Sequence, residues 1–399
     1  MSSALLIIER NEQILSLLYQ ENRLVQVKEH EKREDNTSSL PLNAIYIGKV
    51  KNVVPSIDSA FVEVCNGKMG FLPMKYAKNP IIVNRKYDGR IVAGDEILVQ
   101  IEKEAIKTKD PGLTCNLSFT GKYCVLTTGK QDVGFSTKLD NKTKAFWKQQ
   151  LEEWNMNEIL QAENVGMVVR TNVSGLDGIN LFQEEYKQLF EQKNKVLSSV
   201  SYRTCFSCLL QPMEGYLSDI RDTYENSFDK IVTNKEEIYR RICEEFPTME
   251  NVELYQDSRI PLEKLYSVET RLKEALDERV WLKSGAYLVI QQTEALTVID
   301  VNSGKIQKKN PKDDIYFEIN KEAAREIALQ LRLRNLSGII IVDFISQNTK
   351  EQDNELLGYL SSLVKIDSVK TNVIDMTSLG LVEVTRKKIH KSLREQLKG

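Results

Sequence analysis

The chain has 399 residues and a formal net charge of −2 at pH 7, with 55 Lys and Arg against 57 Asp and Glu. Hydrophobic residues make up 41% and charged residues 28%, which is typical of a globular protein with room for two or more domains. The balanced charge excludes a uniformly basic nucleic-acid binder, so any basic groove has to be local. No apolar run could span a bilayer and the amino terminus is unlike a signal peptide, so we expect a cytoplasmic protein with no membrane partner.

Short strands are expected in the first third of the chain. Residues 1 to about 37 alternate apolar and polar side chains and turn near Glu9–Asn11 and Glu21–Arg23, which predicts a β-hairpin arrangement. From about residue 40 to 122, closely spaced short strands with glycine at the turns predict a small barrel. A mixed segment follows, with a helix expected at 143–154 and a strand at 165–171.

The rest of the chain has two parts that differ in their expected secondary structure. Residues 206–275 look mainly helical, and residues 276–399 alternate strands and helices in α/β fashion. In that last part we expect strands at 287–291, 295–301, 338–345 and 371–376, and helices at 313–335 and 351–364. The first of these helices has a buried face of Ala324, Ile327, Ala328 and Leu331. Its arginines Arg325, Arg332 and Arg334 lie elsewhere and could reach phosphates or be solvated, and solvation is the default interpretation for any one of them.

The cysteines and histidines offer little chemistry. The six cysteines are scattered, as in a reducing compartment. Cys205 and Cys208 form a CxxC motif without a second ligand pair at zinc-site spacing, so we interpret them as small buried hydrophobic residues. The chain has only two histidines, His30 and His390, so acid–base or triad chemistry based on histidine is a poor hypothesis.

Two phenylalanines in the barrel segment indicate a surface for single-stranded nucleic acid. Phe61 in SAFVEV and Phe71 in MGFLPM flank an NGK turn. Exposed aromatic rings stack on any base, and neighbouring lysines can follow the phosphates. The alternative is that both rings belong to the barrel core. The neighbouring lysines that could follow the phosphates are Lys49, Lys51, Lys68, Lys75 and Lys109.

Two aspartates lie at the ends of apolar strands. Asp300 is the next-to-last residue of ALTVIDV, and Asn302 comes two residues after it. Asp343 lies near the end of GIIIVDF. Carboxylates that meet at the ends of neighbouring strands repel each other unless a cation lies between them, and such oxygen ligands suit Mg²⁺ or Mn²⁺. For either aspartate alone, capping of the following turn is the simpler interpretation. For both together we favour a metal, with Asn302 as a neutral third partner.

In this order the segments resemble the ribonuclease E/G family of endoribonucleases over essentially the whole chain. The resemblance rests on NAIYIGKVKNVVPSIDSAFVEV, GFLP, VRT, TEALTVIDVNSGK, AAREIALQLRLRNLSGIIIVDFI and LGLVEVTRK. It implies an α+β multidomain fold. An RNase H-like subdomain, residues 1–37 and 206–275, is interrupted by an S1-type OB-fold barrel at 38–122 and a 5′-sensor region at 123–205. A DNase I-like α/β catalytic subdomain at 276–399 follows.

The resemblance also implies a site and a reaction. Asp300 and Asp343 match the magnesium-ligating aspartates, and Asn302 matches the asparagine that assists them. The reaction is hydrolysis of single-stranded RNA to 5′-phosphate and 3′-hydroxyl ends, in RNA processing and decay. The RNA-binding residues implied are Phe61, Phe71 and Lys109, and the 5′-monophosphate sensor residues implied are Arg170 and Thr171, with Gly134 in the same pocket.

The sequence departs from the family pattern at three points. It stops after LREQLKG, before the family's CPxC zinc link, so we expect no zinc and do not carry over the zinc-linked dimer; another homo-oligomer stays open. It has no long scaffold tail, like the short, G-type members. Ser346 stands where many members have an acid after DFI.

The leading hypothesis is therefore a magnesium-dependent endoribonuclease that acts on single-stranded, A/U-rich RNA and favours 5′-monophosphorylated ends. The main alternative is an RNA-binding protein of the same fold with weak or no catalysis. A metal-dependent phosphohydrolase acting on small molecules is a third hypothesis, and it leaves the barrel aromatics and Arg170 without a role.

Overall fold

The structure is a computed structural model. It describes residues 3–10, 13–32, 40–65, 67–105, 109–176, 178–222, 228–304, 315–347, 349–365 and 367–397, without the Glu31 side chain. The predicted turn at Asn11, Asn66 of the NGK turn and the predicted boundary between residues 37 and 38 lie outside these residues.

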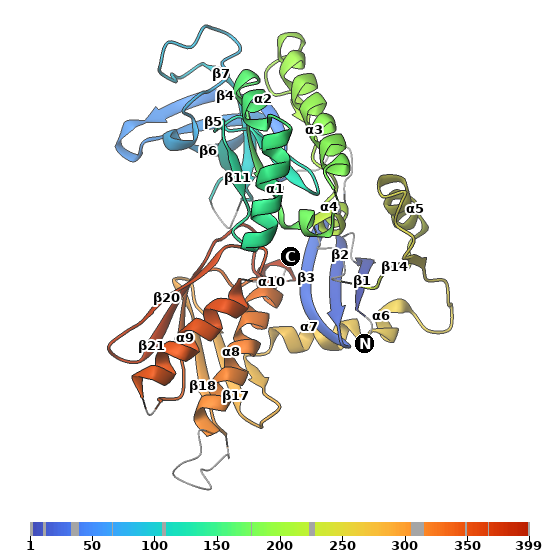
Figure 1. Ribbon diagram of the computed structural model, residues 1–399, viewed down its shortest axis with the longest axis vertical. Coiled ribbons are helices and arrows are strands. Elements are labelled where there is room, and N and C mark those ends of the chain that lie inside the picture. The colour runs from blue at the N-terminus through green and yellow to red at the C-terminus, as the bar shows by residue number, and fades with distance from the viewer. Residues whose placement is uncertain are drawn as a thin grey trace. The chain divides into compact units, whose positions relative to one another are not determined.

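The chain forms two compact units, and the second is inserted into the first. The first unit consists of Met1–Lys32 and Phe228–Gly399, and the second of Arg33–Ser227. Together they make a mixed α+β protein with several separate sheets (Figure 1). None of the helices in the described part of the chain is long and apolar enough to cross a bilayer.

The second unit contains a closed five-stranded barrel, which is compatible with an OB-like domain. The strands follow the order β4-β5-β6-β8-β7, and β7 pairs back with β4 to close the ring. A sixth strand, β13, pairs with the outer end of β4. Bounds are β4 (Ile45–Val54), β5 (Ser59–Cys65), β6 (Lys68–Pro73), β7 (Glu96–Lys103), β8 (Gly112–Thr114) and β13 (Cys208–Leu210), with short 3₁₀ turns η1 (Pro55–Ile57) and η2 (Met74–Tyr76).

A second sheet of the same unit has the order β11-β12-β10-β9, with helices packed on it. The helix and the strand expected at 143–154 and 165–171 are confirmed as α1 and β12. The strands are β9 (Ser118–Thr120), β10 (Cys124–Thr127), β11 (Val133–Phe135) and β12 (Gly166–Val169). The helices are α1 (Asn141–Glu153), α2 (Met156–Ala162), η3 (Thr171–Gly175), α3 (Asn180–Ser199), η4 (Val200–Tyr202) and α4 (Gly215–Asp222).

The first unit begins with three antiparallel strands, as the alternating pattern predicts. They belong to a sheet of order β15-β14-β1-β2-β3, in which β1 pairs in parallel with β14. Helices dominate residues 206–275 as expected, but three strands there, β13, β14 and β15, are absent from the prediction because three or four residues show no measurable period. The elements are β1 (Ala4–Arg10), β2 (Gln13–Gln20), β3 (Arg23–Glu31), β14 (Lys230–Thr233), α5 (Glu236–Glu245), β15 (Val252–Leu254), α6 (Leu262–Leu265) and α7 (Val268–Leu276).

The last sheet of the first unit has the order β16-β17-β18-β19-β21-β20. Only β18 and β19 are parallel, because the long helix α8 connects them as a crossover. The expected strands and helices of this region are confirmed, and the structure adds β16, β21 and α10 to them. Bounds are β16 (Arg279–Trp281), β17 (Tyr287–Gln292), β18 (Leu296–Asn302), α8 (Ile315–Leu333), β19 (Gly338–Asp343), α9 (Lys350–Val364), β20 (Thr371–Met376), β21 (Leu381–Arg386) and α10 (Leu393–Gln396).

Helices α8 and α9 cover one face of this sheet (Figure 1). Ile299 and Val301 of β18 and Val342 of β19 join the core between the sheet and these helices. Solvation, the default interpretation for the three arginines, is wrong for Arg334, which is 7% exposed, and for Arg332, whose Nε is buried and whose pKa is lowered by burial. Arg334 Nε donates to Gln330 Oε1 at 2.5 Å, and burial lowers the pKa of Arg334 to about 10.

The cysteines are all free thiols. Cys205 and Cys208 are half-buried rather than buried, because Cys208 begins the short edge strand β13 and Cys205 lies three residues before it. Each contributes to a hydrophobic cluster of the second unit as a partly buried member. The apolar role expected for these two residues therefore holds, while full burial does not.

Candidate active site

Asp300 and Asp343 lie side by side on the last sheet of the first unit. They are register partners in the parallel pair β18 and β19; Asp343 is the last residue of β19, and Asp300 is two residues before the end of β18. Because Ile299, Val301 and Val342 point into the core with α8 and α9, the alternation of side chains puts both aspartates on the opposite face. Asp300 is half-buried there and Asp343 is exposed. The two carboxylates therefore share one surface of the sheet.

Asn302 completes a set of oxygen ligands. Its Nδ2 donates to Asp300 Oδ2 at 2.7 Å, which fixes the Asp300 carboxylate and leaves the Asn302 amide oxygen as an acceptor on the same face. Within the described ranges, no group of three or more His, Cys, Asp or Glu forms a metal cluster. Two carboxylates and an amide suit Mg²⁺, which commonly takes one or two protein carboxylates and fills its other positions with water and substrate phosphate. The residues present therefore fit a magnesium ion.

Asn320 of α8 positions the backbone that follows Asp343. It is fully buried, its Nδ2 donates to Ile345 O at 2.7 Å, and its Oδ1 accepts from Ile345 N at 3.2 Å. Ser346, which stands where many family members have an acid, directly follows Ile345 and is exposed. Sequence reasoning missed Asn320, although an amide among the apolar side chains of a helix face is a signal for such a role.

Phe61 and Phe71 face each other across strands β5 and β6 of the barrel. They are register partners, and their ring centroids are 5.7 Å apart at an angle of 61°. Both rings are half-buried, while Ala60, Val62 and Leu72 next to them are fully buried in the barrel core. The alternation of side chains therefore places the two rings on the outside of the barrel, and they are not core residues.

Lys109 is far from this aromatic pair in sequence but lies just before a segment that pairs with Phe71. Phe71 N donates to Pro111 O at 2.9 Å, and Phe71 pairs with Gly112 at the start of β8. Lys109, two residues before Pro111, has an exposed side chain. An aromatic pair with an ammonium group beside it is the combination that single-strand binding surfaces use.

Arg170 follows strand β12 and already has an acidic partner. Its Nη1 donates to Asp222 Oδ1 at 2.9 Å and to Gly121 O, and Arg221 Nε donates to the same Asp222 oxygen at 2.7 Å. Burial by itself raises the pKa of Asp222, but the hydrogen bonds and charges of Arg221 and Arg170 outweigh burial and lower that pKa below its usual value. A phosphate at this position would meet two arginines that share one carboxylate.

Thr171 and Gly134 lie near Arg170 in the same sheet region. Thr171 begins η3 immediately after Arg170. Gly134 of β11 pairs with Val168 of β12, two residues before Arg170. A Cβ at Gly134 would lie 3.5 Å from Val168 Cγ2, an ordinary contact, so packing does not require glycine there.

Comparison with known proteins decides the family. The model of the Ribonuclease E/G family matches residues 118–389, more than half of the chain. The chain belongs to this family. Ribonuclease G of Haemophilus influenzae is 31% identical over 373 residues, which cover 88% of this chain and 74% of the relative. Ribonuclease G of Escherichia coli K12 is 29% identical over 376 residues, with the same shares covered.

Relatives named ribonuclease E are longer. Ribonuclease E of Synechocystis is 30% identical over 372 residues, which cover 90% of this chain and 54% of the relative. Ribonuclease E of Nostoc is 28% identical over 367 residues and is covered over 52% of its length. The chain therefore spans about half the length of the ribonuclease E relatives and 74% of the length of the ribonuclease G relatives.

Proposed function

We propose that this chain is a magnesium-dependent endoribonuclease that cleaves single-stranded RNA. The observation that carries the proposal is the pair of register partners Asp300 and Asp343, with Asn302 bonded to Asp300, in a member of the ribonuclease E/G family. Water adds to the phosphorus of a phosphodiester, and the 3′ oxygen leaves and takes a proton. The products carry 5′-phosphate and 3′-hydroxyl ends.

Each site residue has a separate task in this mechanism. Asp300 and Asp343 would hold Mg²⁺, or Mn²⁺ in its place, and the bound ion supplies neutralisation of phosphate charge and a lowered pKa for water. Asn302 keeps the Asp300 carboxylate in one orientation through its 2.7 Å hydrogen bond. Asn320 holds the backbone after Asp343 through two hydrogen bonds to Ile345, which limits movement of the strand end.

The second unit supplies RNA binding in this proposal. Phe61 and Phe71 stack on bases and Lys109 binds phosphate, on the outside of a barrel that we assign as an S1-type OB fold. Arg170 and Thr171, with Gly134 in the neighbouring strand, bind a 5′-monophosphate and give the preference for monophosphorylated ends. RNA processing and decay in the cytoplasm is the corresponding role.

The family's subdomain scheme is part of the same proposal. Residues 38–122 and 123–205 are the S1-type barrel and the 5′-sensor region, inserted into an RNase H-like subdomain of residues 1–37 and 206–275. Residues 276–399 are the DNase I-like catalytic subdomain. The barrel and the six-stranded sheet support this scheme through their extents along the chain.

The test is cleavage of a fluorescent single-stranded RNA by the purified chain with Mg²⁺ and with EDTA, together with RNA binding by fluorescence anisotropy. We expect cleavage with Mg²⁺ only, 5′-phosphate on the downstream product and faster cleavage of 5′-monophosphorylated RNA. Tight binding with no cleavage in Mg²⁺ or Mn²⁺ would support the RNA-binding alternative, for which Ser346 in place of an acid is the motivating feature. Absence of both binding and cleavage would overturn both functions.

A further inference from the structure

An exposed cluster of two aromatic rings and an arginine lies on the edge of the sheet that carries the aspartates. The ring centroids of Trp281 in β16 and Tyr287 in β17 are 5.1 Å apart at an angle of 56°. The guanidinium of Arg279 lies 4.6 Å from the Tyr287 centroid and 5.7 Å from the Trp281 centroid. We call these three residues the Trp281 cluster. Trp281 is 62% exposed, so a large apolar surface faces outward.

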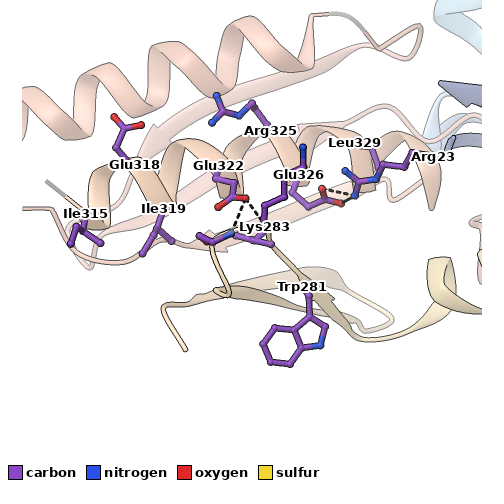
Figure 2. A pocket seen from close by; sticks show the side chains of 12 residues that line it. Arg23, Trp281, Lys283, Ile315, Glu318, Ile319, Glu322, Arg325, Glu326 and Leu329 are labelled. Atoms are coloured by element: carbon purple, nitrogen blue, oxygen red, sulfur yellow. Dashed lines mark hydrogen bonds and ion pairs between the residues drawn. The ribbon is translucent and has the colours of Figure 1, made fainter. Parts of the chain in front are cut away.

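Packing of the sheet does not explain the exposed tryptophan. On either side of it, Val280 packs against the core and Leu282 is 7% exposed within it, so they supply the apolar contacts of this edge strand. The turn after Trp281 is held by Glu322 of α8, whose Oε1 accepts from Lys283 N at 2.8 Å. In Figure 2 the Trp281 ring points away from the labelled side chains of α8. The indole is therefore a fixed, outward-facing group.

Strand register connects the Trp281 cluster to the aspartates. Trp281 pairs with Tyr287, and Tyr287 pairs with Asn302. One row along, Arg279 pairs with Val289, Val289 with Asp300, and Asp300 with Asp343. Since Val280 and Leu288 point into the core, all of these partners lie on the face opposite to the helices.

The separation is short enough for one substrate to touch both places. Two steps between neighbouring strands are roughly 10 Å, which is the expected distance from the backbone of Arg279 to that of Asp300. A base next to the phosphate held at the aspartates can therefore reach the rings. Arg279 places a positive charge on the same row, as a phosphate-bearing ligand requires.

The groove on the other side of the edge strand has no excess of positive charge among the residues that line it. This groove of about 1210 Å³ lies between β16 and α8, and Trp281 is among the residues that line it (Figure 2). Three acids, Glu318, Glu322 and Glu326, and three bases, Arg23, Lys283 and Arg325, line it, and Glu326 is paired with Arg23 at 2.5 Å. Because acids and bases are equal in number, this groove offers a phosphate backbone no net attraction. The face with Asp300 and Asp343 is the one on which the rings and the arginine favour a nucleotide.

We propose that Trp281, Tyr287 and Arg279 form a stacking platform for the base next to the phosphate that is cleaved at Asp300 and Asp343. The platform rests on the proposed ribonuclease function, because its ligand is the single-stranded RNA substrate. Every base has a π-face, so the platform accepts any base and favours those that stack strongly. It fixes the substrate beside the reacting phosphate and is separate from the aromatic pair of the barrel.

The first experiment measures stacking directly. Of the three tryptophans, Trp281 is 62% exposed, Trp154 is half-buried and Trp147 is 1% exposed, so RNA bound to the platform should quench mainly the fluorescence of Trp281. We expect single-stranded RNA in Ca²⁺ to quench the wild-type emission, and Trp281→Phe to lose most of this quenching while keeping RNA binding. An equal fractional quenching in Trp281→Phe would overturn the platform.

The second experiment removes the stacking contact in two ways, by changing Trp281 of the protein and by removing the base of the RNA. Trp281→Ala should lower kcat/KM for a short RNA by roughly 5- to 150-fold, with Trp281→Phe restoring most of it. An RNA with an abasic nucleotide beside the cleavage site should be cut equally slowly by wild type and Trp281→Ala. Ile374→Ala is the control, because Ile374 is 56% exposed on the opposite edge strand β20.

The outcomes separate this proposal from the proposed function. If wild type cleaves RNA and Trp281→Ala cleaves it with unchanged kcat/KM, the platform is overturned and the nuclease stands. If wild type neither binds nor cleaves RNA, both are overturned. If Trp281→Ala changes the oligomeric state in light scattering and Ile374→Ala does not, Trp281 is a contact between copies of this chain and the platform is overturned.

Discussion

Asp300 and Asp343 are directly opposed on the parallel strands β18 and β19, on one face of the sheet. Like charges at opposed positions of a sheet destabilise it, and the hydrogen bond from Asn302 to Asp300 compensates only one of the two carboxylates. A protein that keeps such a pair on an accessible face has a use for two neighbouring negative charges. Binding of a divalent cation is the use that fits oxygen ligands without histidine or cysteine.

Removal of one charge should therefore stabilise the metal-free protein. We expect Asp343→Asn in EDTA to raise the free energy of unfolding by about 0.2–1 kcal/mol, because the repulsion with Asp300 disappears. Thermal unfolding of wild type and variant in EDTA measures this change. Excess Mg²⁺ should reverse the order, since only the wild type gains stability from the bound ion. A clear loss of stability in EDTA would mean that Asp343 has a structural role.

The barrel phenylalanines should contribute to RNA affinity. Phe61→Ala and Phe71→Ala should each weaken binding of a single-stranded oligonucleotide by about 1–3 kcal/mol, because each loses one base stack. The double variant should lose less than the sum, since the two rings are in contact at 5.7 Å. Fluorescence anisotropy measures the affinities. The control is Phe146→Ala, a ring that is 44% exposed on α1; an equal loss in this control would contradict the assignment.

Arg170 should determine the preference for the 5′ end. Arg170→Ala is expected to bring the kcat/KM ratio of 5′-monophosphate to 5′-hydroxyl RNA close to one, because the charge-assisted phosphate contact disappears. Matched substrates that differ only at the 5′ end give this ratio. Arg203→Ala removes an exposed arginine of the same unit and should leave the ratio unchanged. An unaltered ratio in Arg170→Ala would show that the sensor lies elsewhere.

The partner of Arg170 allows a second test of this position. Asp222→Asn keeps an oxygen that can accept from Arg170 Nη1 but removes the charge that Arg170 and Arg221 share. The local positive charge rises, so we expect tighter binding of a 5′-monophosphorylated dinucleotide, measured by calorimetry. Weaker binding would mean that the Asp222 charge is needed to orient Arg170.

The barrel should lose stability in acid through Asp95. This carboxylate is 2% exposed and accepts from Arg85 Nε at 2.6 Å and from Val92 N at 2.8 Å. Burial raises its pKa, but the contacts with Arg85 and Val92 outweigh burial, and the net pKa is lowered. A lowered folded-state pKa gives stability that is complete above the unfolded-state value of about 3.9 and is lost as pH falls through the folded-state value.

Asp95→Asn should flatten that dependence. Between about pH 4 and pH 2 the wild type should lose stability more steeply than the variant, which is less stable by about 1–3 kcal/mol at pH 7 because Arg85 loses a charged partner. Urea unfolding followed by the fluorescence of Trp147, buried in the second unit, measures both effects. Parallel pH curves for wild type and variant would contradict this role of Asp95.

The sequence pattern predicts β18 and β19, the strands that carry Asp300 and Asp343, well because these strands are long and apolar. ALTVIDVN and GIIIVD read as buried strands, and their connection through a long helix favours parallel neighbours. The pattern contains no information on register, so the direct opposition of Asp300 and Asp343 required the structure. Trp281 was missed because β16 has three residues, too few to reveal which face a side chain occupies.

Tertiary contacts account for the other misses. Arg334, the residue after α8, is buried, and its backbone O accepts from Leu393 N, a contact with a distant segment that its sequence position does not indicate. Strand β14 pairs with β1, and Ala4 and Lys230 are partners far apart in sequence. Such pairings depend on the whole fold rather than on local propensity.

The most direct test of the account is single-turnover cleavage of an end-labelled single-stranded RNA by Asp300→Asn, Asp343→Asn and Asp375→Asn beside the wild type in Mg²⁺. Asp375 is an exposed aspartate of the edge strand β20 in the same sheet, which makes it a matched control. We expect wild type and Asp375→Asn to cleave alike, and the other two to bind RNA normally but cleave it on the order of 10²–10³ times more slowly. Wild-type rates in Asp300→Asn and Asp343→Asn, or an equal loss in Asp375→Asn, would contradict the assignment of this pair as the catalytic site.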